Sequence, residues 1–153
     1  MKIMDILVKE GVILDLASDT KDAVLEEMAR SVSAAEPSLN ADRLLEVLVD
    51  REALQSTGIG DGVAIPHGKI AGLERLVASF ARSVKGVDFE SIDGQPTHHF
   101  FLLVVPEHSG GQYLKALARI SRFFRDAAFR QQLTEAKALE DVLRAIQEED
   151  AKL

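Results

Sequence analysis

The sequence predicts an α+β domain of three layers, in which a mixed β-sheet is flanked by helices on both faces. Two observations support this fold class. Short apolar runs typical of strands are concentrated in the middle of the chain, between residues 63 and 105. Apolar residues at helical spacing dominate before and after that region, so helices are available to cover both faces of one central sheet.

Length and composition indicate a single globular domain spanning residues 1–153. A chain of this length buries roughly 70% of its extended surface on folding. Apolar residues make up 46% and charged residues 28%, which is typical of folded proteins. The chain has no cysteine, no signal-peptide pattern and no apolar run long enough to span a membrane. We therefore expect a cytoplasmic location without membrane insertion.

The first part of the chain is predicted to contain one strand and two helices. Residues 12–16 form a short apolar run that favours a strand. A first helix is expected to begin after potential capping residues at Ser18–Thr20 and to run to about Val32. Asn40 is expected to cap a second helix, whose apolar stripe ends near residues 51–53.

The middle of the chain is predicted to supply most of the sheet. A glycine-rich loop at Gly58–Gly62 precedes a short strand at residues 63–65. Two further strands are expected at residues 76–82 and 97–105, with a turn at residues 93–96 between them.

The last part of the chain is predicted to be helical. After Gly110, one helix has an apolar face comprising Leu114, Leu117, Ala118, Ile120, Phe123 and Phe124. The adjacent phenylalanine pair is expected to be partly exposed, because neighbours on a helix cannot both face one core direction. Shorter helices follow near residues 127–136 and 139–147, and residues 148–153 are expected to fray.

His67 is the main candidate for chemistry. It lies between Pro66 and Gly68, directly after the glycine-rich loop, and such neighbours suit an exposed loop better than a helix or central strand. A neutral imidazole is a good phosphoryl acceptor near neutral pH, since its ordinary pKa is about 6.5. We therefore interpret His67 as a site of reversible phosphorylation.

A transferred phosphoryl group also needs stabilisation of its negative charge. Arg51, at the end of the second predicted helix, has the fork geometry for this role. Ser56 and Thr57 offer hydroxyl donors, although both hydroxyls can instead bond the loop backbone. Gly68 allows the backbone to approach the phosphoryl oxygens.

These residues form a pattern that resembles a known family. Arg51-Glu52, Ser56-Thr57, Gly58–Gly60 and Ile65–Gly68, followed by landmarks at Asp93–Pro96, Pro106-Glu107 and Leu114–Leu117, are similar to the enzyme IIA domains of the phosphotransferase system. The similarity covers nearly the whole chain. The mannitol/fructose branch, and within it the nitrogen-regulatory subgroup, is the closer match.

The resemblance implies a mixed sheet flanked by helices, with His67 phosphorylated by a small histidine phosphocarrier protein. The phosphoryl group would then pass to a IIB domain or be sensed by a regulatory target. Arg51 would stabilise its charge. No cofactor is implied, and the net charge of −7 argues against a nucleic-acid partner.

The chain departs from the family at one position. Tyr113 lies where members usually carry a second histidine, directly before Leu114. A tyrosine hydroxyl can donate a hydrogen bond to a phosphoryl oxygen but cannot become a charged donor. His108 is a candidate to reach the same space. Three functions therefore stay open: a regulatory phosphoryl carrier, a transport component that feeds a separate IIB chain, and an interaction module without phosphorylation.

The other histidines do not suggest a metal site. His98 and His99 are adjacent in a predicted strand, so their side chains should point to opposite faces and not share an ion. No metal is expected elsewhere. Lys69 is interpreted as a residue at the rim of the site, without a part in phosphoryl transfer.

Overall fold

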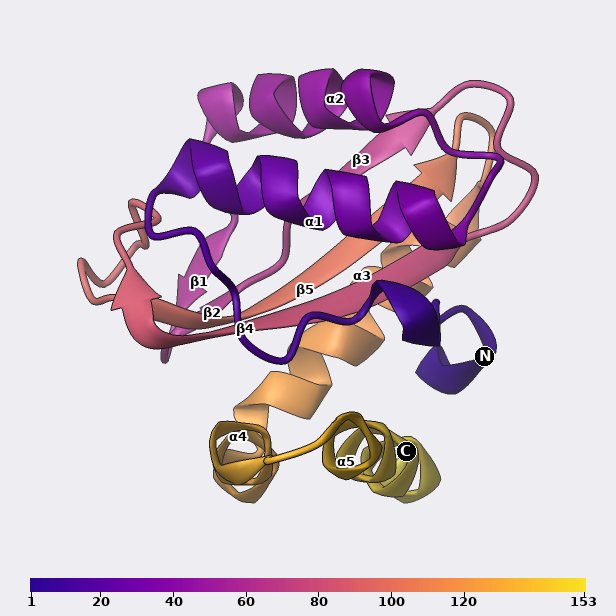
Figure 1. Ribbon diagram of the computed structural model, residues 1–153. Coiled ribbons are helices and arrows are strands. Elements are labelled where there is room, and N and C mark those ends of the chain that lie inside the picture. Colours follow the sequence, from indigo (N-terminus) through magenta and orange to yellow (C-terminus); the bar gives the residue numbers. More distant parts are fainter.

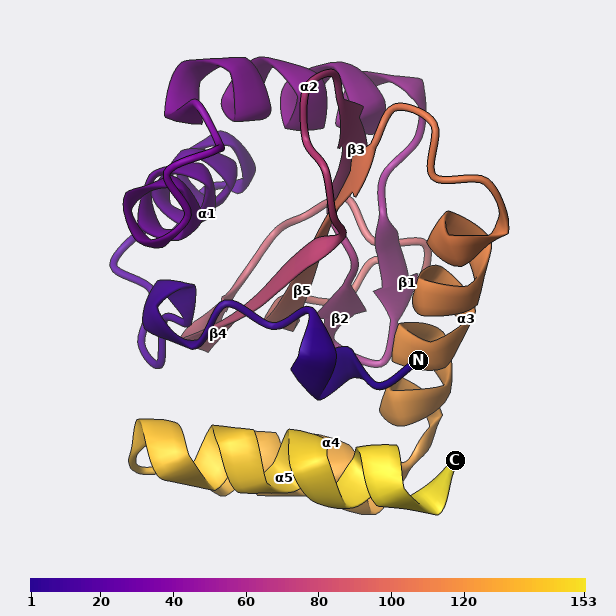
Figure 2. The same cartoon turned by 90° about the vertical axis from the view of Figure 1, so that its right-hand side faces the viewer.

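The computed structural model describes all 153 residues and has three layers. Helices α1 (Lys21–Ala35) and α2 (Ala41–Leu54) cover one face of the sheet. The other face is covered by three helices, α3 (Gly111–Arg125), α4 (Ala127–Glu135) and α5 (Leu139–Lys152). Figures 1 and 2 show these two groups on opposite sides of the strands. The predicted fold class is confirmed.

Strand β5 (Thr97–Pro106) organises the mixed sheet. Along one edge it pairs in parallel with β2 (Val63–Ala64) and then with β3 (His67–Ile70). Its other edge pairs antiparallel with β4 (Val77–Val87). Strands β2 and β3 thus follow one another along the same neighbour, interrupted where Pro66 cannot donate a backbone hydrogen bond.

The glycine-rich loop contains a short strand that the sequence analysis did not predict. Strand β1 (Gly58–Gly60) pairs antiparallel with β2 through a tight turn. Gly60, Asp61 and Gly62 all have positive φ in this turn, a conformation that glycine adopts without steric cost. The glycines are therefore explained by a hairpin.

Each face of the sheet buries its own hydrophobic core. Alternate residues of β5 contribute to each core, with Phe101 and Leu103 toward α3–α5 and Phe100 and Leu102 toward α1 and α2. Both predicted helix caps are present. The Thr20 hydroxyl accepts from the Ala23 amide at 3.3 Å, and the Asn40 side chain accepts from the Arg43 amide at 2.9 Å. No helix is long and apolar enough to cross a lipid bilayer.

The predicted strand at residues 12–16 is wrong. The chain instead forms two 3₁₀ turns, Ile3–Asp5 and Lys9–Gly11, and then runs along the outer edge of β4. Only scattered backbone bonds form there, such as Ile13 N–H to Phe80 O at 2.9 Å and Leu16 N–H to Arg82 O at 2.8 Å. The apolar pattern indicated an extended segment, but the pairing is too irregular for a continuous ladder.

The expectations for α3 and the C-terminus need correction. Leu114 and Ala118 are exposed, so the buried face of α3 is narrower than predicted. Phe123 and Phe124 are both buried, because Phe124 packs against Phe101 while both phenylalanines pack against Phe129 of α4. Helix α4 therefore covers the side of α3 that does not face the sheet.

Residues 148–152 do not fray, because they continue α5. Glu149 and Asp150 are buried there. The Asp150 carboxylate accepts hydrogen bonds from the backbone amides of Ile3 and Met4 and from Arg119. The N-terminal turn is thereby tied to the last helix, which keeps the C-terminal residues ordered.

His98 and His99 have different surroundings. His99 is 4% exposed and stacks between Phe80 and Phe124. His98 is half-buried, and its Nδ1 donates to the Ser83 carbonyl at 2.9 Å. Both nevertheless border one cavity, at the end of the sheet where the pairing of β4 with β5 shifts register.

The buried imidazole of His99 should make stability depend on pH. Burial, with the nearby positive charges of His98, Arg82 and Arg130, lowers its pKa to about 4. Between the ordinary pKa of about 6.5 and this value the unfolded chain binds more protons, so stability is lost as pH falls through that window. At 1.36 kcal/mol per pKa unit, the unfolding free energy falls by about 3 kcal/mol as the pH drops through this window.

We expect His99→Phe to remove that pH dependence while keeping the aromatic stack. Urea unfolding at pH 7 and at pH 4.5 measures the free energy of unfolding of wild type and variant. Between pH 7 and pH 4.5 the variant should lose less of this free energy than the wild type does. An equal loss in both proteins would contradict the lowered pKa.

Candidate functional site

His67 is the first residue of β3 and lies opposite Leu103 of β5. Its side chain is only 7% exposed, so the expectation of an exposed loop is wrong. The backbone explains the difference. Pro66 interrupts the strand, but its carbonyl accepts from Leu103 N–H at 2.9 Å, so the chain stays beside β5 and resumes pairing at His67. Because β3 is short and lies at an edge, it tolerates a preceding proline.

The protonation of the His67 ring is fixed by its own backbone. Nδ1 lies 2.7 Å from the Ile65 carbonyl oxygen. A carbonyl oxygen can only accept, so Nδ1 carries the hydrogen and Nε2 keeps its lone pair. This contact selects one nucleophilic nitrogen, which sequence reasoning had left open.

The electrostatic surroundings favour the neutral imidazole. Burial lowers the pKa of His67, and the positive charge of Arg51 lowers it further. The hydrogen bond to Ile65 and the negative charge of Glu52 act in the opposite direction but are outweighed. At neutral pH the ring is therefore uncharged, which is the form that can act as a nucleophile.

Arg51 lies in the last turn of α2 and is half-exposed. Its Nη1 donates to the Gln55 carbonyl at 2.7 Å, and it forms no ion pair with Asp50 or Glu52. A guanidinium has five N–H donors, so most of them stay free. The structure thus places an uncompensated positive charge close enough to affect His67 and Tyr113.

The hydroxyl groups of Ser56 and Thr57 are already bonded within the protein. The Ser56 hydroxyl donates to the Phe89 carbonyl at 2.8 Å and accepts from the Gly58 amide. The Thr57 hydroxyl donates to the Glu52 carboxylate, which also accepts from the Thr57 amide at 3.0 Å. Both side chains therefore hold the loop between α2 and β1 in place.

Glu52 is a positioning residue that the sequence analysis named only as part of the Arg51-Glu52 motif. It is buried, and it pairs with Lys21 of α1 at 3.1 Å. Together with its bonds to Thr57, this pair connects α1, the end of α2 and the loop before β1. The sequence shows Glu52 directly after Arg51, but it does not indicate that Lys21, thirty-one positions earlier, pairs with Glu52.

Tyr113, in the first turn of α3, lies beside His67 with the ring centroids 5.8 Å apart. Burial raises the pKa of its hydroxyl, which therefore stays protonated as a donor. The Lys69 ammonium lies 5.5 Å from the Tyr113 ring centroid, so Lys69 also borders this group. His108 is exposed in the preceding loop and makes no ring contact or hydrogen bond with His67.

Gly68 is required by packing between β3 and α2. A Cβ atom at this position would overlap Cγ1 of Val47. Such an overlap requires the Val47 side chain to rotate or α2 to shift. The glycine therefore allows Val47 of α2, the helix that carries Arg51, to pack directly against β3.

We expect Gly68→Ala to destabilise the fold by about 1–3 kcal/mol, the usual cost of overpacking. Val47→Ala removes the clashing methyl group, so the double variant should recover a large part of that loss. Urea unfolding of the two single variants and the double variant measures the coupling. Additive losses would show that the clash is not the cause.

No cluster of three or more histidine, aspartate or glutamate side chains is arranged to hold a metal ion. The groups gathered around His67 are instead one buried imidazole, one guanidinium with free donors and one phenol. These groups suit the binding of a small anion beside the free lone pair of Nε2.

Comparison with known proteins identifies the family to which the chain is similar. The family model "Phosphoenolpyruvate-dependent sugar phosphotransferase system, EIIA 2" matches residues 5–149. The nitrogen regulatory protein of Bradyrhizobium diazoefficiens is 43% identical, and the alignment covers 94% of this chain and 95% of that protein. The fructose-specific EIIABC component of Bacillus subtilis is 36% identical over 98% of this chain but only 24% of its own length.

Solved structures give the same result. The nitrogen regulatory protein IIA-Ntr from Neisseria meningitidis superposes with a TM-score of 0.88 at 34% identity, covering 94% of this chain and 98% of that chain. IIA mannitol from Escherichia coli has a TM-score of 0.75 at 16% identity, covering 90% of this chain and 96% of that one. The second likeness concerns the fold alone.

Proposed function

Since the chain belongs to the EIIA 2 family of the phosphoenolpyruvate-dependent sugar phosphotransferase system, we propose that it carries a phosphoryl group on Nε2 of His67. The observation that carries this proposal is the bond between Nδ1 and the Ile65 carbonyl. It holds the ring in the tautomer whose free lone pair lies on Nε2.

The transfer needs no proton movement at His67. The Nε2 lone pair attacks the phosphorus atom of a phosphohistidine on the donor protein, and the donor's N–P bond breaks as the new one forms. The donor nitrogen leaves with the electron pair. Nδ1 keeps its hydrogen, and the Ile65 carbonyl stabilises the positive charge that the substituted ring acquires.

Arg51 and Tyr113 complete the proposed site. The free N–H groups of Arg51 neutralise the phosphoryl oxygens, and the Tyr113 hydroxyl donates one further hydrogen bond. Ser56 and Thr57 act mainly by holding the loop, since their hydroxyls have protein partners. Gly68 contributes its backbone and the close approach of α2.

We expect Arg51→Lys to slow phosphorylation of His67 by about tenfold or more, because a single ammonium cannot reproduce the planar fork. A loss of one charge-assisted hydrogen bond corresponds to that order of effect. Arg43→Lys, an exposed arginine at the start of α2, is the matched control. Rates followed by quenched-time mass spectrometry should fall only for Arg51→Lys. Equal rates in both variants would exclude Arg51 from the site.

We infer a regulatory output, with a small histidine phosphocarrier protein as the donor and a cytoplasmic target that distinguishes the two states. Relatives named nitrogen regulatory proteins support this assignment. Phosphorylation adds about two negative charges beside Tyr113 and Lys69, which changes the surface presented to a target.

The test is to incubate the purified chain with phosphoenolpyruvate, enzyme I and a histidine phosphocarrier, and to measure intact mass before and after mild acid. We expect an acid-labile gain of one phosphoryl group. Adding a separate IIB domain then distinguishes the two carrier functions, since a transport component would lose its label rapidly and a regulatory one would keep it. A chain that gains no label, beside a control domain that does, would be an interaction module.

A further inference from the structure

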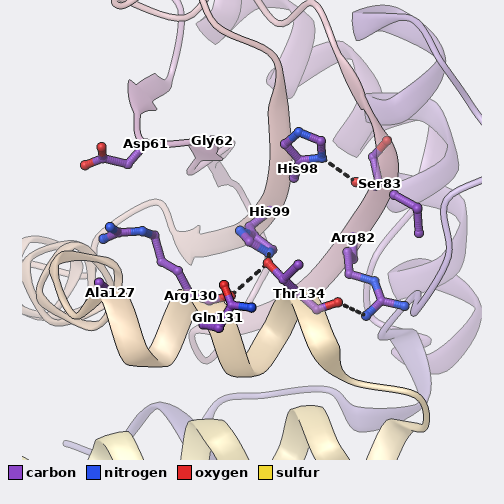
Figure 3. Close-up of a pocket in the computed structure, with 11 residues that line it drawn as sticks. Asp61, Gly62, Arg82, Ser83, His98, His99, Ala127, Arg130, Gln131 and Thr134 are labelled. Atoms are coloured by element: carbon purple, nitrogen blue, oxygen red, sulfur yellow. Dashed lines mark hydrogen bonds between the residues drawn. The ribbon is translucent and has the colours of Figure 1, made fainter.

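The polar cavity that His98 and His99 border lies at the opposite end of the sheet from Tyr113. It has a volume of about 420 Å³ and is formed by the turn at Asp61, the paired ends of β4 and β5, and one side of α4 (Figure 3). Along β5, His99 is four residues from Leu103, the partner of His67, which corresponds to about 13 Å of strand. The cavity is therefore separate from the phosphorylation site.

Arg130 supplies a free positive charge to this cavity. Its Nη1 donates to the Phe124 carbonyl, and it forms no ion pair with any carboxylate. Figure 3 shows the side chain extending from α4 across the space toward Asp61. The remaining N–H donors are available to bind an anion in the paired geometry that suits a carboxylate or phosphate.

Arg82 borders the cavity but has no capacity to spare. Its guanidinium donates to the carbonyls of Leu14, Leu133, Thr134 and Ala136 and pairs with Asp15 at 2.9 Å. It joins the end of α4 to the sheet. Arg130 is thus the arginine of this cavity that can take a ligand.

His99 presents an acceptor without a partner. The Thr134 hydroxyl donates its hydrogen to the Arg130 carbonyl at 3.0 Å, so it can only accept from His99 Nε2 at 3.2 Å. Nε2 therefore carries the ring hydrogen, and Nδ1 has a lone pair with no hydrogen-bond partner. In Figure 3 this second nitrogen is on the side of the ring turned toward Arg130 and Gly62. A buried acceptor without a donor is costly, and a ligand hydroxyl would satisfy it.

We propose that this cavity binds a small organic anion that also carries a hydroxyl group. Its carboxylate or phosphate binds the Arg130 guanidinium, and its hydroxyl donates to Nδ1 of His99. The volume falls within the range of small-molecule sites, and most of the residues that line the cavity are polar, which suits a hydroxylated anion over an apolar ligand. The proposal does not depend on phosphorylation of His67.

Titrations of the full chain followed by backbone-amide NMR test the proposal. The probes are glycerol 3-phosphate and glycerate, which differ in the anionic group, and propyl phosphate, which lacks hydroxyls. Saturable shifts are expected at Gly62, Ser83 and Gln131 with the hydroxylated probes. Whichever of glycerol 3-phosphate and glycerate binds more tightly identifies the anionic group that the cavity prefers. Shifts absent from these residues, or equal binding of propyl phosphate, would overturn the proposal.

Two variants separate the contributions. Arg130→Gln should weaken binding of glycerol 3-phosphate by at least about tenfold, whereas Arg122→Gln, an exposed arginine of α3 outside the cavity, should not. His99→Phe keeps the stack with Phe80 and Phe124 but lacks the acceptor, so it should reduce the affinity for glycerol 3-phosphate to that for propyl phosphate. Unchanged affinity in both Arg130→Gln and His99→Phe would contradict the assignment.

Discussion

His67→Gln is expected to abolish phosphorylation by the histidine phosphocarrier. The glutamine fills much of the same volume but has no nucleophilic nitrogen, so no phosphoryl group can be attached. Volume matters because the ring is 7% exposed, and His67→Ala would leave a gap beside Tyr113. Intact-mass measurement of the variant after incubation with phosphoenolpyruvate and the carrier proteins gives the result directly.

His108→Gln is the matched control, since His108 is exposed in the loop before α3. It should be labelled as fast as the wild type. Thermal unfolding of both variants excludes misfolding as the reason for a lost label. Label on the folded His67→Gln variant would place the phosphoryl group on another side chain and contradict the proposed site.

Asp150→Ala is expected to reduce the free energy of unfolding by about 3–5 kcal/mol, the range for breaking a buried ion pair by removing one partner. The Asp150 side chain is 2% exposed and accepts from Ile3 N–H at 3.0 Å, Met4 N–H at 2.9 Å and Arg119 Nε at 3.1 Å. Its removal leaves the buried amide of Ile3 and the partly buried amide of Met4 without an acceptor, and Arg119 without its carboxylate.

Glu148→Ala tests whether this loss comes from the interaction and not from a weaker helix. Glu148 is exposed two positions earlier in α5, so its replacement should change stability by no more than about 0.5 kcal/mol. Urea unfolding at pH 7 measures both variants. A similar small change for Asp150→Ala would mean that the N-terminal turn does not depend on α5.

The helices were predictable because their signals are local. The caps at Thr20 and Asn40 and the apolar stripes that follow them define α1 and α2 within a few residues. The strand at residues 97–105 was equally clear from its apolar run. Such signals depend on neighbours within one turn or a few residues, and these are visible in one dimension.

Errors arose where distant residues decide the outcome. Residues 148–152 read as a frayed end because the partners of Asp150 lie at the opposite terminus. The Phe123–Phe124 pair is buried because α4 covers α3 as well as the sheet. In both cases the tertiary contact overrides the local pattern.

The functional site also combines features with a local sequence signal and features that depend on distant contacts. Sequence reasoning found His67 and Tyr113, which the structure brings together across β3 and α3. It missed the backbone contact from Ile65 and the Lys21–Glu52–Thr57 connection, because carbonyl directions and side-chain burial follow only from the fold. Gly68 was identified for a ligand reason, whereas its closest neighbour is Val47 of α2.

The measurement that tests the central claim most directly is ¹⁵N NMR of the histidine ring in the phosphorylated chain. Two-bond correlations to the ring hydrogens distinguish phosphorylation at Nε2 from phosphorylation at Nδ1. We predict a phosphoryl group on Nε2 of His67, with the Nδ1 hydrogen still present and protected by its bond to Ile65. Phosphorylation at Nδ1 would require that bond to break, and would contradict the account of how the backbone selects the nucleophile.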